Sequence, residues 1–115
     1  MRPQGQSHKG DTMISERLGK LLVAQVKSEL GAHQVYLGLS LYFERQSLHK
    51  WAKLYRDQSV EEAGHASKIM AFLIDNEIEF ELPGLPAATT HYGSAVEAVQ
   101  VALASEVKVT GQFNA

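Results

Sequence analysis

Near the middle of the chain, residues 58–66 read QSVEEAGHA and set Glu62 three positions before His65. Two side chains with this spacing lie on one face of an α-helix. Four apolar side chains continue that face on either side of the pair: Trp51, Tyr55, Ile69 and Phe72. Because an ionisable pair inside an apolar stripe is costly to bury alone, this pair needs a partner from elsewhere in the chain.

The motif belongs to a predicted helix over about residues 49–76, and a longer helix is predicted over residues 15–45. The longer segment contains no proline, and roughly 30 residues of helix extend about 45 Å. Its apolar stripe is predicted to comprise Leu18, Leu22, Val26, Glu29, His33, Tyr36, Ser40 and Phe43. Two long helices with so short a connection are expected to pack as an antiparallel hairpin.

Residues 77–93 are predicted to form an extended crossover. Their helix-breaking residues are Pro83, Gly84, Pro86 and Gly93. About 17 extended residues can span on the order of 50 Å, which returns the chain to the far end of the hairpin. A third helix is predicted over residues 94–115, with Ser94 and Glu97 as its capping box. We expect the chain to stop inside this helix, with the fourth helix of an all-α antiparallel bundle missing.

Composition limits the class of protein. The 115 residues are 44% hydrophobic and 21% charged, as in an ordinary globular domain, with residues 1–12 as an expected disordered leader and residues 13–115 as one helical domain. The net charge of -2 argues against a nucleic-acid partner. The absence of cysteine excludes thiolate metal sites and disulfides. Without an apolar run of about 18 residues or a signal peptide, we expect no membrane partner and a cytoplasmic location.

Counting along the helices brings three carboxylates to one layer. Glu29 lies roughly 24 Å before the end of the first helix, and Glu62 lies roughly 20 Å into the second. If the crossover spans the bundle, Glu106 lies roughly 18 Å into the third helix, level with Glu62. Three separate segments therefore deliver carboxylates beside the imidazole of His65.

Carboxylates and one imidazole inside a helical bundle suit iron or manganese better than zinc. Di-iron bundles use one Glu from each of two helices and Glu-x-x-His from each of two others. Single residues have plainer alternatives: Glu61 as a solvated carboxylate, Glu106 as a surface residue, and Tyr36 as a core residue or a hydrogen-bond partner of a metal ligand. A purely structural hairpin with solvated glutamates also remains open.

At these residues the sequence resembles the non-haem bacterial ferritins. The stretches that carry the resemblance are SEL at 28–30, YFER at 42–45, QSVEEAGHA at 58–66, ELP at 81–83 and ALASE at 102–106. The separations of 33, 3 and 41 residues between Glu29, Glu62, His65 and Glu106 agree with the family pattern. The resemblance covers residues 13–115.

The resemblance implies a ferritin-like fold with a dinuclear iron site that cycles between Fe(II) and Fe(III). It implies that Glu29, Glu62 and His65 bind the first iron, and that Glu62 bridges to a second iron held by Glu106. Glu61 would lie near a third, weaker site, and Tyr36 would support the ligands. No haem is expected, because Ala63 stands where bacterioferritins have their haem-ligating methionine.

The same resemblance implies a ferroxidase that oxidises Fe(II) with oxygen or peroxide and stores the Fe(III) mineral in a homo-oligomeric cage of 24 subunits. The 115 residues are expected to lack the fourth and fifth helices of the family. One alternative therefore stays open: a truncated subunit that acts as an assembly or binding module. It would complete its bundle with another chain and have no ferroxidase activity of its own.

Overall fold

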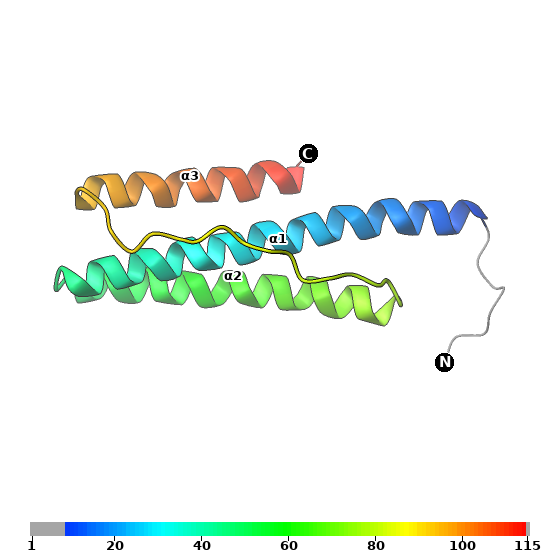
Figure 1. Cartoon of the computed structure of the whole chain (residues 1–115), viewed down its shortest axis with the longest axis horizontal. Helices are drawn as coiled ribbons and strands as arrows, with labels where there is room; N and C mark the ends of the chain where they lie inside the picture. Colours follow the sequence, from blue (N-terminus) through cyan, green and yellow to red (C-terminus); the bar gives the residue numbers. More distant parts are fainter. Residues whose placement is uncertain (1–8, 115) are drawn as a thin grey trace.

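The computed structural model describes the backbone of residues 9–114 and the side chains of residues 16–106. This part contains three helices and no strand: α1 (Lys9–Arg45), α2 (His49–Asp75) and α3 (Ala95–Asn114). α1 and α2 form the expected antiparallel hairpin, and α3 begins beside their turn and runs parallel to α2 (Figure 1). The predicted all-α architecture is confirmed.

α1 and α2 both end in the same hydrogen-bonded turn, although neither has the usual glycine. After α1, Ser47 has φ 61° and the Leu48 N–H donates to the Phe43 carbonyl at 2.9 Å. After α2, Glu77 has φ 56° and the Ile78 N–H donates to the Leu73 carbonyl at 2.9 Å. These Schellman motifs satisfy the last carbonyls of each helix and fix where the chain turns.

α1 begins at Lys9, six residues before its predicted start, so residues 9–12 of the expected leader are helical. Residues 13–15 precede the predicted stripe without proline, and helical hydrogen bonding continues toward the N-terminus through Gly10, which helices tolerate at a modest cost. The rest of the expected leader, residues 1–8, lies outside the described part. α3 covers the predicted third helix except Ala115, which also lies outside it.

The line of α2 that faces α1 is rotated from the predicted stripe. Its innermost positions repeat every seven residues: Ala52, Ser59, Ala66 and Leu73, each at most 1% exposed. Small side chains let the two backbones approach closely, so Trp51 and Phe72, which were predicted to lie in the core, are displaced to its edge and are each 46% exposed. The predicted burial of Leu18 is also wrong. It is 42% exposed, whereas the next residue, Gly19, is buried and faces Ile78 at the start of the crossover.

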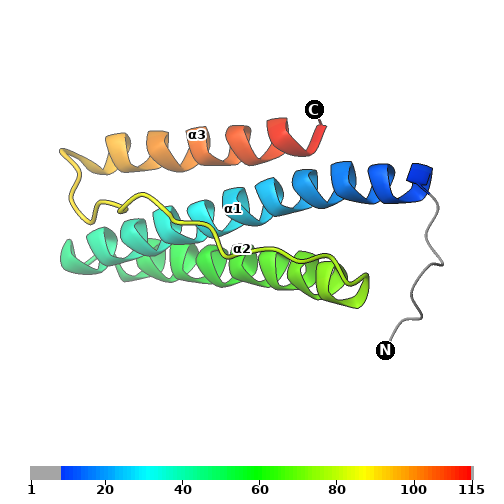
Figure 2. The same cartoon turned by 45° about the vertical axis from the view of Figure 1, so that its right-hand side comes forward.

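The crossover runs back along the hairpin and passes very close to α1 (Figures 1 and 2). At Gly38, an added Cβ would lie 2.2 Å from the Thr89 carbonyl oxygen, so only glycine fits there. Beyond this point, Arg45 Nη1 lies 2.9 Å from His91 Nδ1 and links the end of α1 to the crossover. These contacts hold the segment that places the start of α3.

α3 packs on α1 through Ala98 and Ala102, which are 0% and 5% exposed. Its predicted cap is confirmed, because the Glu97 N–H donates to Ser94 Oγ at 3.1 Å. Glu97 Oε2 in turn accepts from the Gly93 N–H at 3.1 Å, one residue earlier than in a standard capping box. The cap therefore fixes the start of α3.

Candidate metal centre

α1 and α2 bring together three of the predicted site residues. Glu29, Glu62 and His65 each offer one ligand atom, and these atoms lie within 4.8 Å of one another. His65 Nδ1 is 3.5 Å from Glu29 Oε2 and 3.6 Å from Glu62 Oε2. The two carboxylate side chains are 3% and 5% exposed, whereas the His65 side chain is 46% exposed, so solvent reaches the group from the imidazole side.

The hydrogen bonds of the two glutamates leave one oxygen of each without a partner. Glu29 Oε1 accepts from Gln25 Nε2 at 3.0 Å, and Glu62 Oε1 accepts from Gln58 Nε2 at 3.1 Å. Within the described part of the structure, Glu29 Oε2 and Glu62 Oε2 are buried and have no hydrogen-bond partner. Leaving two such oxygens unsatisfied is costly, and a cation between them and His65 would remove that cost. Two carboxylate oxygens and one imidazole nitrogen are suitable ligands for Fe(II) or Mn(II).

Burial also changes the acid–base chemistry of the group. The pKa of Glu62 is raised to about 6, first because burial removes water from the carboxylate and then because Glu29 lies beside it. The donated hydrogen bond from Gln58 and the charge of His65 act in the opposite direction. Two adjacent carboxylates are therefore held together in the fold at a cost that a bound cation would offset.

Glu106 lies next to this group without joining its three ligand atoms. It is exposed on α3, and its Oε1 accepts a short hydrogen bond from the Tyr36 hydroxyl. The same oxygen lies 3.5 Å from Gln58 Nε2, whose other acceptor is Glu62. Glu106 is thus at the predicted height, and one glutamine amide links its carboxylate to that of Glu62.

Tyr36 and Glu61 occupy different environments. Tyr36 is 2% exposed and stacks on Tyr55 with ring centroids 5.9 Å apart, so it is both a core residue and a hydrogen-bond donor to Glu106. Burial and the neighbouring Glu106 raise the pKa of its hydroxyl, which keeps it protonated as a donor. Glu61 is exposed and belongs to no group of three possible ligands among the described side chains.

Sequence reasoning missed the contribution of Gln25, which is 9% exposed and bonded to Glu29. A signal for it exists in the sequence, because Gln-x-x-x-Glu occurs at 25–29 and again at 58–62. It also missed the hydrogen bonds that join α1 to α2 one turn from the site. Ser59 Oγ donates to the His33 carbonyl at 2.9 Å, and His33 Nδ1 lies 2.8 Å from the Ser59 carbonyl.

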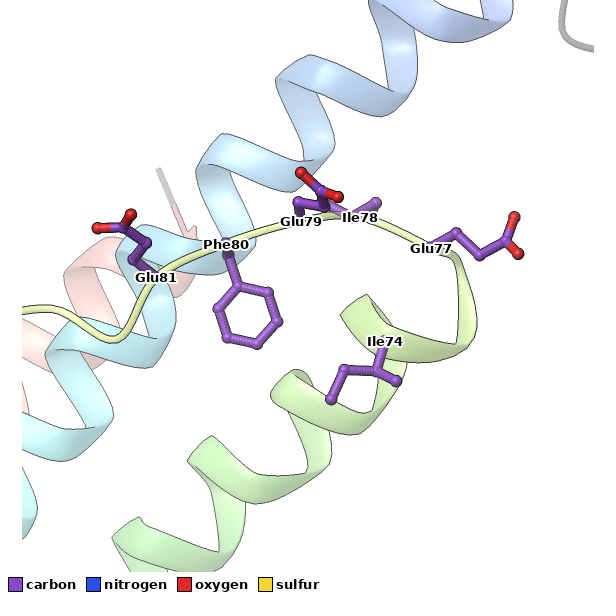
Figure 3. Close-up of a pocket in the computed structure, with 6 residues that line it drawn as sticks. All are labelled: Ile74, Glu77, Ile78, Glu79, Phe80 and Glu81. Atoms are coloured by element: carbon purple, nitrogen blue, oxygen red, sulfur yellow. The ribbon is translucent and has the colours of Figure 1, made fainter. Parts of the chain in front are cut away.

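A separate hollow lies where α2 passes into the crossover, beyond the metal-ligand group (Figure 3). Phe80 extends from the crossover toward α2, which carries Ile74, while the side chains of Glu77, Glu79 and Glu81 point in different directions (Figure 3). The three carboxylates do not converge on a common point. The hollow therefore has no arrangement suited to holding a cation.

Comparison with known proteins agrees with this geometry. Residues 19–115 match the family model described as Ferritin-like domain. The chain belongs to the ferritin family. Over 101 residues it is 31% identical to Ferritin BfrB of Mycolicibacterium smegmatis, covering 88% of the chain and 56% of the relative. Over 85 residues it is 31% identical to the Bacterial non-heme ferritin of Bacteroides fragilis, covering 74% and 54%.

Solved ferritin structures have the same fold. The apo-ferritin of Pseudo-nitzschia multiseries superposes with a TM-score of 0.79 at 29% identity, covering 84% of this chain and 62% of the other. A PmFTN variant soaked in iron gives a TM-score of 0.79 at 30% identity with the same coverage. This ferritin chain spans about half the length of the curated relatives it matches. None of its described helices is long and apolar enough to cross a membrane.

Proposed function

We propose that this chain is a cytoplasmic ferritin subunit that binds Fe(II) at Glu29, Glu62 and His65 and oxidises it to Fe(III) for storage. The observation that carries the proposal is the pair of buried, unpartnered Oε2 atoms of Glu29 and Glu62, which lie 3.5 and 3.6 Å from His65 Nδ1. Family membership and the likeness to a ferritin variant soaked in iron favour iron as the substrate.

A second iron would bind between Glu62 and Glu106, and Glu61 would serve a weaker accessory position. This part of the proposal is supported by the shared amide of Gln58, which already lies between Glu62 Oε1 and Glu106 Oε1. Tyr36 would hold Glu106 toward the site through its hydrogen bond. A bound cation there would compete with the Gln58 amide for the same two oxygens.

In the proposed reaction, two Fe(II) ions each lose one electron. The two electrons, with two protons, reduce one O₂ to hydrogen peroxide, or one peroxide to water. The anionic carboxylates favour the more highly charged ferric product, and the rigid α1–α2 hairpin keeps the two ions close enough to act on one oxidant. Residues 13–115 would act as one domain, within the 24-subunit homo-oligomer expected of a full-length relative.

A second candidate function is an assembly module that completes its bundle with another chain and has no ferroxidase activity alone. One observation favours it: an apolar hollow between the starts of α2 and α3 is lined by Phe43, Leu48, Trp51, Ala95, Val96, Val99 and Gln100. Several of these side chains are large, apolar and exposed, with Trp51 at 46% and Val96 at 68%. An amphipathic helix from another chain would bury them. This candidate predicts metal bound per dimer instead of per chain.

The deciding experiment is aerobic oxidation of Fe(II), followed as ferric absorbance, in the parent chain and in a Glu62→Ala, His65→Ala double variant. The ferroxidase proposal predicts oxidation well above the buffer rate in the parent and buffer-rate oxidation in the variant. A matched control, Glu79→Ala, alters an exposed carboxylate that belongs to no ligand group among the described side chains and should keep the activity. If the parent and double variant both match buffer, the assembly candidate replaces the ferroxidase proposal.

A further inference from the structure

Two glutamines stand in the same relation to the two buried glutamates. Gln25 lies four residues before Glu29 on α1, and Gln58 lies four residues before Glu62 on α2. Each donates one amide N–H to the Oε1 atom of its glutamate, at 3.0 and 3.1 Å. The same arrangement is thus built twice, once from each helix of the hairpin.

In each glutamate, the glutamine donates to only one of the two carboxylate oxygens. In both glutamates Oε1 is bonded, while Oε2 is buried, unpartnered and near His65 Nδ1. A carboxylate with one oxygen held by a donor can rotate less freely and offers its other oxygen in a fixed direction. Without the donor, either oxygen could face a cation, or both could bind it together.

A simpler interpretation is that these are ordinary glutamine–glutamate pairs that support a helix from its surface. Burial argues against it for α1, because Gln25 is 9% exposed and Glu29 is 2% exposed. A pair that only supported the helix would have no reason to leave a buried oxygen without a partner on both helices. The repeated orientation toward one imidazole instead indicates a role at the metal centre.

We propose that Gln25 and Gln58 are positioning residues that select Oε2 of Glu29 and Glu62 as the cation ligand and hold each carboxylate to single-oxygen coordination of the first cation. The inference rests on the proposed function and deepens it. Gln25 provides the cleaner test, because its one described acceptor is Glu29, whereas Gln58 also approaches Glu106.

The test is titration of the metal-free chain with Co(II), which reports ligand number and geometry through its visible absorption bands. The variants are Gln25→Met and Gln58→Met, which retain side-chain length and helix propensity but remove the donor. Gln34→Met is the matched control, because Gln34 is a half-buried glutamine of α1 that lines a different groove. Circular dichroism checks that each variant remains helical.

We expect Gln25→Met and Gln58→Met each to weaken binding of the first Co(II) ion about 10–100-fold and Gln34→Met to leave it unchanged. The Co(II) bands should change shape in both site variants. In infrared difference spectra with Zn(II), the separation of the antisymmetric and symmetric carboxylate stretches should fall, as one-oxygen coordination gives way to two-oxygen coordination. A role in folding alone would alter neither spectrum.

Two outcomes would overturn the inference, and the second of them would also overturn the proposed metal site. If the parent binds Co(II) and both site variants bind it with the same affinity and spectra, the positioning role is wrong and the proposed site stands. If the parent itself does not bind Co(II), both the proposed site and the positioning role are wrong. Should the Met variants lose helical structure, Gln25→Asn and Gln58→Asn keep a polar amide but shorten its reach, and the same loss of affinity is expected.

Discussion

At the scale of single residues, the candidate metal centre contains a buried carboxylate that lowers the stability of the metal-free fold. Glu62 is 4% exposed and lies beside Glu29, and its Oε2 atom has no hydrogen-bond partner among the described residues. Its pKa rises from an ordinary 4.5 to about 6, chiefly through burial. Such a cost is retained in proteins mainly where the charged form serves a purpose, such as holding a cation.

The raised pKa predicts the sign of a pH effect on the metal-free protein. Between pH 4.5 and about 6 the folded carboxyl binds more protons than the unfolded one, so the free energy of unfolding should fall as pH rises. A shift of this size corresponds to about 2 kcal/mol. Glu62→Gln should therefore stabilise the metal-free chain by about 2 kcal/mol at pH 7 and by almost nothing at pH 4.5, as measured by urea unfolding with a chelator present.

The neighbouring exposed carboxylate offers the control for this prediction. Glu61→Gln changes the same charge one position away, at a side chain that stays in solvent, and should alter the free energy of unfolding little at either pH. An equal effect of Glu62→Gln at both pH values would contradict the burial argument. It would indicate that the substitution acts through packing or helix propensity instead of charge.

At the scale of elements, α3 is held to the hairpin by small apolar contacts at one end and by hydrogen bonds to Glu106 farther along. Tyr36 donates the main hydrogen bond to Glu106, and its ring is fixed by stacking on Tyr55. Tyr36→Phe should keep the ring packing and lose the bond, which lowers the free energy of unfolding by about 1–2 kcal/mol. Backbone amides of α3 should exchange hydrogen faster, as measured by hydrogen-exchange mass spectrometry.

Tyr55→Phe supplies the comparison, because the described part of the structure shows ring contacts for Tyr55 and its substitution leaves the bond to Glu106 in place. Its α3 amides should therefore exchange at the parent rate. Equal protection of α3 in the parent and in Tyr36→Phe would mean that the hydrogen bond from Tyr36 to Glu106 does not help to hold the helix.

The crossover depends on one close approach of two backbones. At Gly38 an added Cβ would meet the Thr89 carbonyl oxygen at 2.2 Å, and backbone atoms yield less readily than side chains. Gly38→Ala should lower the free energy of unfolding by about 1–3 kcal/mol, measured in urea. Gly31→Ala places its new methyl group more than 4 Å from any neighbour in the described part of the structure and should instead stabilise α1 by up to about 1 kcal/mol. Stabilisation by both substitutions would contradict this close contact.

At the scale of the whole molecule, hydrophobic periodicity and residue counting predicted the features of the fold that follow from the geometry of a helix. They predicted the hairpin, the direction of α3 and the meeting of Glu29, Glu62 and His65, because a fixed rise per residue sets these heights. They misplaced Trp51, because a helical stripe does not reveal which of its edges a neighbouring helix covers. The non-glycine turn at Ser47 was also invisible, since its sequence lacks the usual marker.

If cation binding relieves the cost at the site, its effect should extend to the stability of the entire chain. A cation that binds only the folded state stabilises it by about 2.7 kcal/mol at 100 times its dissociation constant. Addition of Co(II) should therefore raise the melting temperature of the parent by several degrees, as followed by circular dichroism. The Glu62→Ala, His65→Ala variant lacks two of the three ligands and should show no such rise.

Repeating the melt at several protein concentrations shows whether the chain holds the cation alone or together with another copy. A single-chain site gives one melting temperature at fixed free Co(II), whereas a bundle completed by a second copy gives a melting temperature that increases with protein concentration. An equal rise in the parent and the double variant would mean that Co(II) stabilises the fold from somewhere other than Glu29, Glu62 and His65.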